Sequence, residues 1–177
     1  IKILHINSYF FSNGLHLELV SKLAERDIEQ HIFIPLDKKA TEPSLEEIRN
    51  TTFYITRCFT NVHRYLWPIK IFLIFREFNK AYKKNSNKFT IVHAHSLFVN
   101  GTIAFLIKLK YKIPYIVTVR NSDINTFFKK SFVFRHWGYL IMKAADKVIT
   151  LSIKYFTIHI KSYLSVLKYE ILRKKHL

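Results

Sequence analysis

Short apolar runs alternate along this chain with longer segments in which apolar residues recur at helical spacing. The runs lie at residues 1–6, 30–35, 52–56, 90–93, 115–119 and 147–151. A run of this length bounded by polar turns indicates a buried strand, whereas intervals of three and four indicate a helix with one apolar face. Strands that alternate with helices are typical of a doubly wound α/β fold. We therefore predict a Rossmann-like parallel sheet in a three-layer α/β/α arrangement.

The unit from Phe89 to Asn125 organises the rest of the chain. Its two strands flank a helical segment, and a crossover of this length requires parallel strands. Ligands of open parallel sheets bind beyond the carboxyl ends of the strands. Here these ends are followed by dense polar groups. The candidate site residues in them are His95, Asn100, Arg120, Asn121, Asp123 and Asn125.

The expected strand order is 3-2-1-4-5-6, in which the first strand neighbours the fourth. Asn13 and Gly14, in the turn after the first strand, are then expected to face His95 and Asn100. A glycine at this position lets backbone N–H groups approach a phosphate at a helix N-terminus. The alternative is that Gly14 serves only a tight turn.

Helices are expected in three other places. The first begins near Leu15 with Ser12 or Asn13 as its cap. Its apolar stripe should lie on the sheet and consists of Leu15, Leu19, Val20, Leu23 and Ala24. The second covers residues 66–84, with Pro68 in its first turn. The third covers residues 127–145. We expect a Rossmann-like domain over residues 1–152 and a basic helical tail over residues 153–177.

The formal net charge of the 177-residue chain is +17, and it is unevenly distributed. Residues 1–60 carry seven basic and eight acidic side chains, whereas the rest carries 22 and four. Such a field attracts anionic lipid, nucleic acid or phosphorylated ligands, although a lysine-rich composition alone also explains it. The basic segment 66–84 suits either an anionic membrane surface or packing on the sheet.

Several classes of function lack their sequence signals. No GxGxxG or GxxxxGK[ST] motif is present. His93 and His95 lack a third metal ligand of recognisable spacing, so no metal site is expected. Specific nucleic-acid binding has no motif beyond charge. With a single cysteine, no apolar leader and no apolar run of about 20 residues, we expect a cytoplasmic location, peripheral to the membrane at most.

Arg120 at the end of an apolar strand suits the binding of a phosphate or carboxylate. The alternative is that Arg120 to Asn125 form a solvated turn, for which Asn, Ser and Asp are ordinary residues.

Four motifs in order resemble the N-terminal domain of family 4 glycosyltransferases, which have the GT-B fold. They are residues 2–8 with Gly14, residues 89–95, residues 113–121 and residues 145–152. The resemblance implies one half of a GT-B enzyme, the half that chiefly holds the acceptor. It further implies the transfer of a sugar, with retention of anomeric configuration, from a nucleotide-sugar to a saccharide or lipid-linked acceptor. No metal or other cofactor is implied. The implied role is bacterial envelope polysaccharide synthesis.

The resemblance also implies roles for residues. Gly14, with Asn13, approaches the donor diphosphate, and Arg120 stands where many members have a histidine beside the reacting centre. His95, Asn100, Asn121, Asp123 and Asn125 line the acceptor side.

The sequence departs from the family pattern in three places. These are Arg120 itself, a single glycine in the first turn, and Arg26 to Glu29 where a glycine and a histidine are common. The donor-binding residues of the second domain are absent from the sequence, so the half is expected to be inactive alone. The alternative function is a non-catalytic basic module that binds anionic membrane or polyanion.

Overall fold

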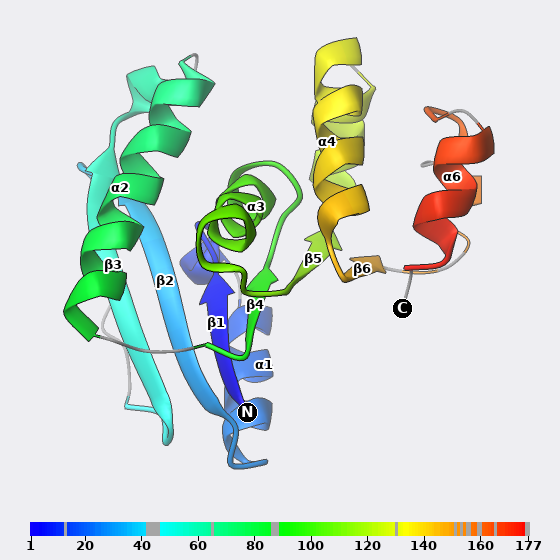
Figure 1. The fold of residues 1–177 in the computed structure, drawn as a ribbon. Helices are drawn as coiled ribbons and strands as arrows, with labels where there is room; N and C mark the ends of the chain where they lie inside the picture. The colour runs from blue at the N-terminus through cyan, green and yellow to red at the C-terminus, as the bar shows by residue number, and fades with distance from the viewer. Residues whose placement is uncertain are drawn as a thin grey trace. The chain divides into compact units, whose positions relative to one another are not determined.

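A computed structural model describes residues 1–12, 14–41, 47–64, 66–85, 89–129, 131–150, 152, 154, 157–158, 161–164 and 166–175. The chain divides into two compact units, residues 1–92 and 93–177 (Figure 1). Each unit is described separately below. No helix among the described residues is long and apolar enough to cross a membrane.

The described residues of the first unit form three complete strands, two α-helices and two short 3-10 helices. In chain order its elements are β1 (Lys2–Ile6), η1 (Phe10–Ser12), α1 (Leu15–Ala24), β2 (Glu29–Asp37), β3 (Thr51–Phe59), η2 (Asn61–Arg64) and α2 (Trp67–Asn85).

The second unit continues the same alternation of strands and helices. Its elements are β4 (Ile91–Ala94), which starts at the end of the first unit, α3 (Val99–Tyr111), β5 (Tyr115–Val119), the π-helical segment η3 (Asp123–Phe128), α4 (Phe132–Ala144), β6 (Lys147–Thr150) and α6 (Val166–Arg173).

The six strands form one parallel sheet in the order β3-β2-β1-β4-β5-β6. This confirms the predicted strand order and the Rossmann-like α/β fold. The third strand lies at the edge, as expected, although it is longer than the predicted residues 52–56. The short strands β4, β5 and β6 begin within one or two residues of the predicted positions.

The core of the first unit follows from the alternation of side chains along β2. Ile32 and Ile34 point to the face covered by α1, where they form a cluster with Val20. Phe33 points to the other face, where its ring centroid lies 5.5 Å from that of Phe78 on α2. The sheet of this unit therefore has one helix on each face (Figure 1).

The segment predicted as a basic tail contains α6, which packs in the second unit. Tyr169 and Leu172 on this helix are buried. The backbone N–H of Val148 on β6 donates to the carbonyl of Lys175 at 2.9 Å. Helix α6 and Lys175 are therefore packed within this unit.

The expected cap of α1 is wrong, and its expected apolar stripe holds for every member except Leu15. Its N-cap position is Gly14, which has no side-chain cap, and the Ser12 hydroxyl instead donates to the carbonyl of Tyr9 at 2.6 Å. Asn13, the other predicted cap, lies outside the described residues. Of the predicted stripe, Val20 and Ala24 are buried but Leu15 is 68% exposed, because it lies in the first turn, ahead of the contact with the sheet.

The single helix expected over residues 127–145 is also wrong in its start. A π-helical segment occupies Asp123–Phe128, and α4 begins only at Phe132. The break coincides with Ser131, an extended residue whose hydroxyl oxygen accepts the backbone N–H of Phe134. A serine at this position is a typical N-cap, so a new helix starts there.

Candidate site at the carboxyl ends of β4 and β5

The predicted polar groups after β5 lie on a turn that runs into the π-helical segment. Arg120 directly follows the strand and is half-buried. Asn121 and Asn125 are exposed, whereas Asp123 is only 3% exposed. The segment 120–125 is therefore not the uniformly solvated turn that its composition suggested, because its single carboxylate is buried.

Asp123 joins the turn after β4 to the turn after β5. Its Oδ2 accepts the backbone N–H of Leu97 at 3.0 Å and that of Arg120 at 2.9 Å. The backbone N–H of Asp123 in turn donates to the carbonyl of Arg120 at 3.0 Å. The carboxylate thus fixes the backbone from which the Arg120 side chain starts.

The burial of Asp123 has an electrostatic consequence. Removal from water raises the pKa of the carboxyl from 3.8 to about 6, because the charged form is poorly solvated inside. The N–H groups of Arg120, Leu97 and Phe98 and the guanidinium of Arg120 act in the opposite direction. At neutral pH the group is an anion held mainly by backbone dipoles.

The two histidines at the end of β4 lie side by side. The ring centroids of His93 and His95 are 4.1 Å apart. His93 Nε2 lies 2.9 Å from the hydroxyl of Thr118 on β5, so this hydrogen bond fixes the first ring against the neighbouring strand. The alternation predicted from sequence, with both rings on one side, is consistent with this geometry.

His95 and Asn100, two predicted acceptor-side residues, are buried. His95 is 6% exposed and Asn100 is 0% exposed. Asn100 lies in the first turn of α3 beside Gly101, whose N–H donates to the carbonyl of Ser96 at 2.9 Å. A Cβ at Gly101 would lie 3.1 Å from Ile141 and 3.2 Å from the Ser96 carbonyl oxygen, so this turn is closely packed.

Gly14, the predicted phosphate-side residue of the first unit, lies in open space. An added Cβ there would meet no atom within 4 Å. Its backbone is helical, with φ −69° and ψ −15°, so its conformation does not require glycine. Whatever favours glycine at this position therefore lies outside the described contacts of this chain. Its predicted partner Asn13 lies outside the described residues.

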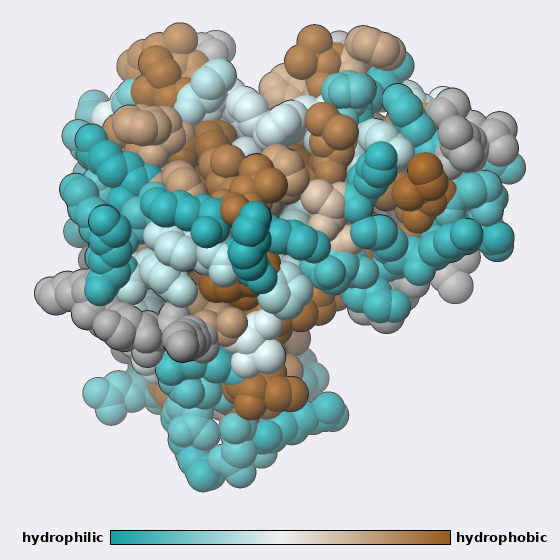
Figure 2. Space-filling view, viewed as in Figure 1, coloured by the Kyte–Doolittle hydropathy of each residue, from teal (hydrophilic) through white to brown (hydrophobic). Residues whose placement is uncertain are grey.

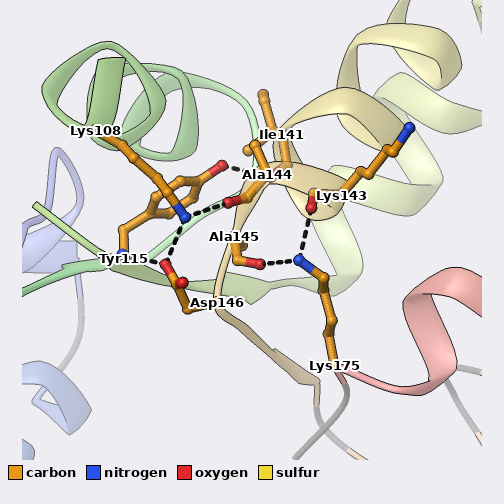
Figure 3. Close-up of polar contacts among 8 residues, drawn as sticks. All are labelled: Lys108, Tyr115, Ile141, Lys143, Ala144, Ala145, Asp146 and Lys175. Carbon is orange, nitrogen blue, oxygen red and sulfur yellow. Dashed lines mark hydrogen bonds and ion pairs between the residues drawn. The ribbon is translucent and has the colours of Figure 1, made fainter. Parts of the chain in front are cut away.

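A second polar cluster lies at the amino ends of β5 and β6 (Figure 3). Asp146 Oδ2 accepts the Lys108 ammonium at 2.8 Å and the backbone N–H of Tyr115 at 3.0 Å. Although burial opposes it, these donors hold the pKa of the Asp146 carboxyl below its ordinary value. The Asp146 of the last sequence motif is thus explained by a structural contact between two strands and α3.

Lys175 extends this cluster from the end of α6. Its Nζ donates to the carbonyls of Lys143 at 2.7 Å and Ala145 at 2.6 Å (Figure 3). Cations stabilise the last carbonyls of a helix, here those of α4. Burial lowers the pKa of the Lys175 ammonium. All these donors and acceptors are engaged with the fold, so we assign this cluster to stability.

Sequence reasoning missed two participants in the site. Thr118 was read only as part of a strand, and the backbone N–H of Leu97 has no sequence signal at all. The alternation along β5 places Thr118 on the face opposite Val117 and Val119, and this is the one signal that could have drawn attention to it.

The family of the chain follows from comparison with known proteins. A profile of Glycosyltransferase Family 4 matches residues 16–156, most of the chain. The chain belongs to glycosyltransferase family 4. The match includes the turns after β4 and β5 with Arg120 and Asp123, so the candidate site is part of the family region. No curated protein matches the chain.

Solved structures of GT-B glycosyltransferases share the fold. Sucrose-phosphate synthase from Thermosynechococcus elongatus matches with a TM-score of 0.67 at 13% identity, over 91% of this chain and 45% of that one. TcCGT1 in complex with UDP matches with a TM-score of 0.62 at 11% identity, over 99% and 50%. UGT89C1 of Arabidopsis thaliana, complexed with UDP-L-rhamnose, matches with a TM-score of 0.56 at 12% identity, over 92% and 49%. The chain spans about half the length of these proteins.

Proposed function

We propose that this chain is the acceptor-binding half of a retaining glycosyltransferase. The complete enzyme would move a sugar from a nucleotide-sugar to a saccharide or lipid-linked acceptor in bacterial envelope polysaccharide synthesis. The family match carries the proposal, because it includes Arg120 at the carboxyl end of β5, where ligands of such sheets bind. The UDP complexes of two structural neighbours support a nucleotide-sugar donor.

The chemistry in this proposal is positioning and charge stabilisation. The Arg120 guanidinium would stand beside the reacting centre and stabilise the diphosphate as it leaves. Asp123 would act as a positioning residue, since its carboxylate holds the Arg120 backbone N–H at 2.9 Å. Asn121 and Asn125 are exposed on the same turn and would offer amide groups to acceptor hydroxyls. Gly14 would admit the donor diphosphate to the N-terminus of α1.

In this proposal two domains are needed for the reaction. The donor half is supplied by a second domain, and this chain alone has little or no transfer activity. The reaction requires no metal or other cofactor in this proposal. The enzyme works at the cytoplasmic face of the membrane.

The decisive experiment joins this chain to the C-terminal donor domain of a family relative and measures sugar transfer from labelled UDP- and GDP-sugars. We expect transfer that Arg120→Ala abolishes and that Arg173→Ala leaves intact. Arg173 is a suitable control because it is an exposed arginine on α6, paired with Glu170 at 2.9 Å. A folded chimera that transfers no sugar from any donor would overturn the proposal and favour the non-catalytic basic module, to which the +17 charge points.

A further inference from the structure

Helix α2 packs most of its apolar surface against the sheet. Ile71, Ile74 and Phe78 recur at intervals of three and four and are buried. This face meets the sheet, as the contact between Phe78 and Phe33 shows. The helix is therefore not a free amphipathic element whose main apolar face is available to a membrane.

The end of this helix nonetheless exposes large apolar side chains. Phe72 is 64% exposed and Ile69 is 45% exposed on its first turns. Leu66, just before the helix, is 46% exposed, and Val62 on η2 is 65% exposed. Figure 2 shows apolar atoms gathered on the surface where η2 and the first turns of α2 lie. We call these four residues the apolar tip.

The outward face of α2 changes from apolar to basic along its length. Residues 69, 72, 76, 80 and 83 follow one another at intervals of three and four, so they form one outward stripe. Arg76, Lys80 and Lys83 make up its basic part, and all three are exposed. By sequence, residues 61–85 hold six basic residues and one acidic residue, Glu77.

We propose that the apolar tip docks into the surface of an anionic lipid bilayer, with the basic stripe against the headgroups. The stripe from Ile69 to Lys83 is about 21 Å long at the helical rise, enough to extend from the acyl boundary through the headgroup region. Isolated exposed apolar residues are ordinary, but four in one turn-and-helix end mark an interaction surface. The adjoining excess of positive charge selects anionic lipid as the partner, because each basic side chain near such a surface is attracted to it.

This inference does not rest on the proposed transfer reaction. The tip and stripe belong to the first unit, and the test below needs neither donor nor acceptor. A chain that binds lipid but supports no transfer, or the reverse, separates the two proposals.

The test measures binding of the full 177-residue chain to vesicles of phosphatidylcholine with and without phosphatidylglycerol, at about 0.1 M salt. We expect binding only to the anionic vesicles. Ile69→Ser with Phe72→Ser should weaken it about tenfold or more, because two apolar side chains that the bilayer would bury are lost. Arg76→Gln, Lys80→Gln and Lys83→Gln together should weaken it about a hundredfold. Neither variant should lower the melting temperature, since these side chains are exposed.

The matched control is Phe132→Ser with Val133→Ser at the start of α4. These two side chains are 79% and 74% exposed, at least as much as the tip. The control should bind anionic vesicles like the unaltered chain. Equal losses in the tip variant and this control, equal binding to neutral vesicles, or no binding at all would each overturn the proposal. Lipid-independent dimers that the tip variant dissociates, with vesicle binding unchanged, would reassign the tip to contact between two copies of this chain.

Discussion

Asp123 Oδ2 lies 3.0 Å from the backbone nitrogen of Leu97, a residue 26 positions earlier in the chain. The same oxygen accepts the backbone N–H of Arg120 at 2.9 Å. One carboxylate therefore satisfies two donors from the turns that follow β4 and β5. Buried N–H groups need acceptors, so this contact is a condition for the geometry of the candidate site.

Removal of the Asp123 acceptor should destabilise the second unit. Asp123→Ala leaves the N–H groups of Leu97 and Arg120 without their acceptor, and each such loss costs about 1–3 kcal/mol. We expect a decrease of about 2 kcal/mol or more in the free energy of unfolding at pH 7, measured by urea denaturation. Asp123→Asn keeps an amide oxygen for these donors and should remain within about 1 kcal/mol of the unaltered chain.

The comparison of the two substitutions makes this test specific. A structural role through hydrogen bonding requires that Asn restores what Ala removes. Equal destabilisation by both would mean that the negative charge, and not the acceptor oxygen, holds the two turns together.

The titration of Asp123 should make stability depend on pH. Burial raises the pKa of its carboxyl from 3.8 to about 6, so the native state retains a proton that the unfolded chain has already lost between these values. The contribution is therefore fully present below about pH 4 and is lost as the pH rises through about 6. Its full size is on the order of 3 kcal/mol.

Urea denaturation between pH 4 and 8 checks this dependence. Other groups also titrate in this range, so the informative quantity is the difference between the unaltered chain and Asp123→Asn. That difference should change by about 2 kcal/mol in favour of the unaltered chain as the pH falls from 7 to 4. A constant difference would show that Asp123 titrates at the same pH in the folded and unfolded chains.

The sequence was sufficient for the strands and their order because both depend on local patterns and general rules. The apolar run Tyr115–Val119 alternates between buried and half-buried residues, and right-handed parallel crossovers restrict the possible orders. Residue types alone did not show that Asp123 is buried. Its acceptor role depends on Leu97, whose donor is a backbone group that every residue except proline possesses.

The errors in the predicted helices also arise from tertiary contacts, which local sequence patterns do not show. The π-helical segment Asp123–Phe128 has a polar start that is typical of a turn, and the burial of Phe128 and Ile124 keeps it folded against the unit. Leu15 fits an apolar stripe by spacing but lies too early on α1 to reach the sheet. Periodicity predicts a face of a helix, and it does not predict how far the partner surface extends.

Gly138 is required by packing. A Cβ at this position would lie 2.5 Å from Cε2 and 2.8 Å from Cζ of the Phe128 ring, which is fully buried. Helix propensity alone would make alanine more favourable by about 1 kcal/mol, but overpacking typically costs about 1–3 kcal/mol. We expect Gly138→Ala to lower the free energy of unfolding, measured by urea denaturation. An increase would mean that the ring moves aside freely.

Gly14 provides the opposite case, because nothing in the described structure requires it. Its backbone is helical and an added Cβ would meet no atom within 4 Å, so Gly14→Ala should change the free energy of unfolding by no more than about 0.5 kcal/mol.

The same substitution should affect sugar transfer. If Gly14 admits a diphosphate, the added methyl group must displace it. A misplacement of about 1 Å is enough to lower the rate tenfold or more. In the chimera with a donor domain, we therefore expect Gly14→Ala to reduce sugar transfer by at least about tenfold while the melting temperature stays constant. Unchanged transfer would assign Gly14 to the turn alone and would leave Arg120 as the test of where the chemistry occurs.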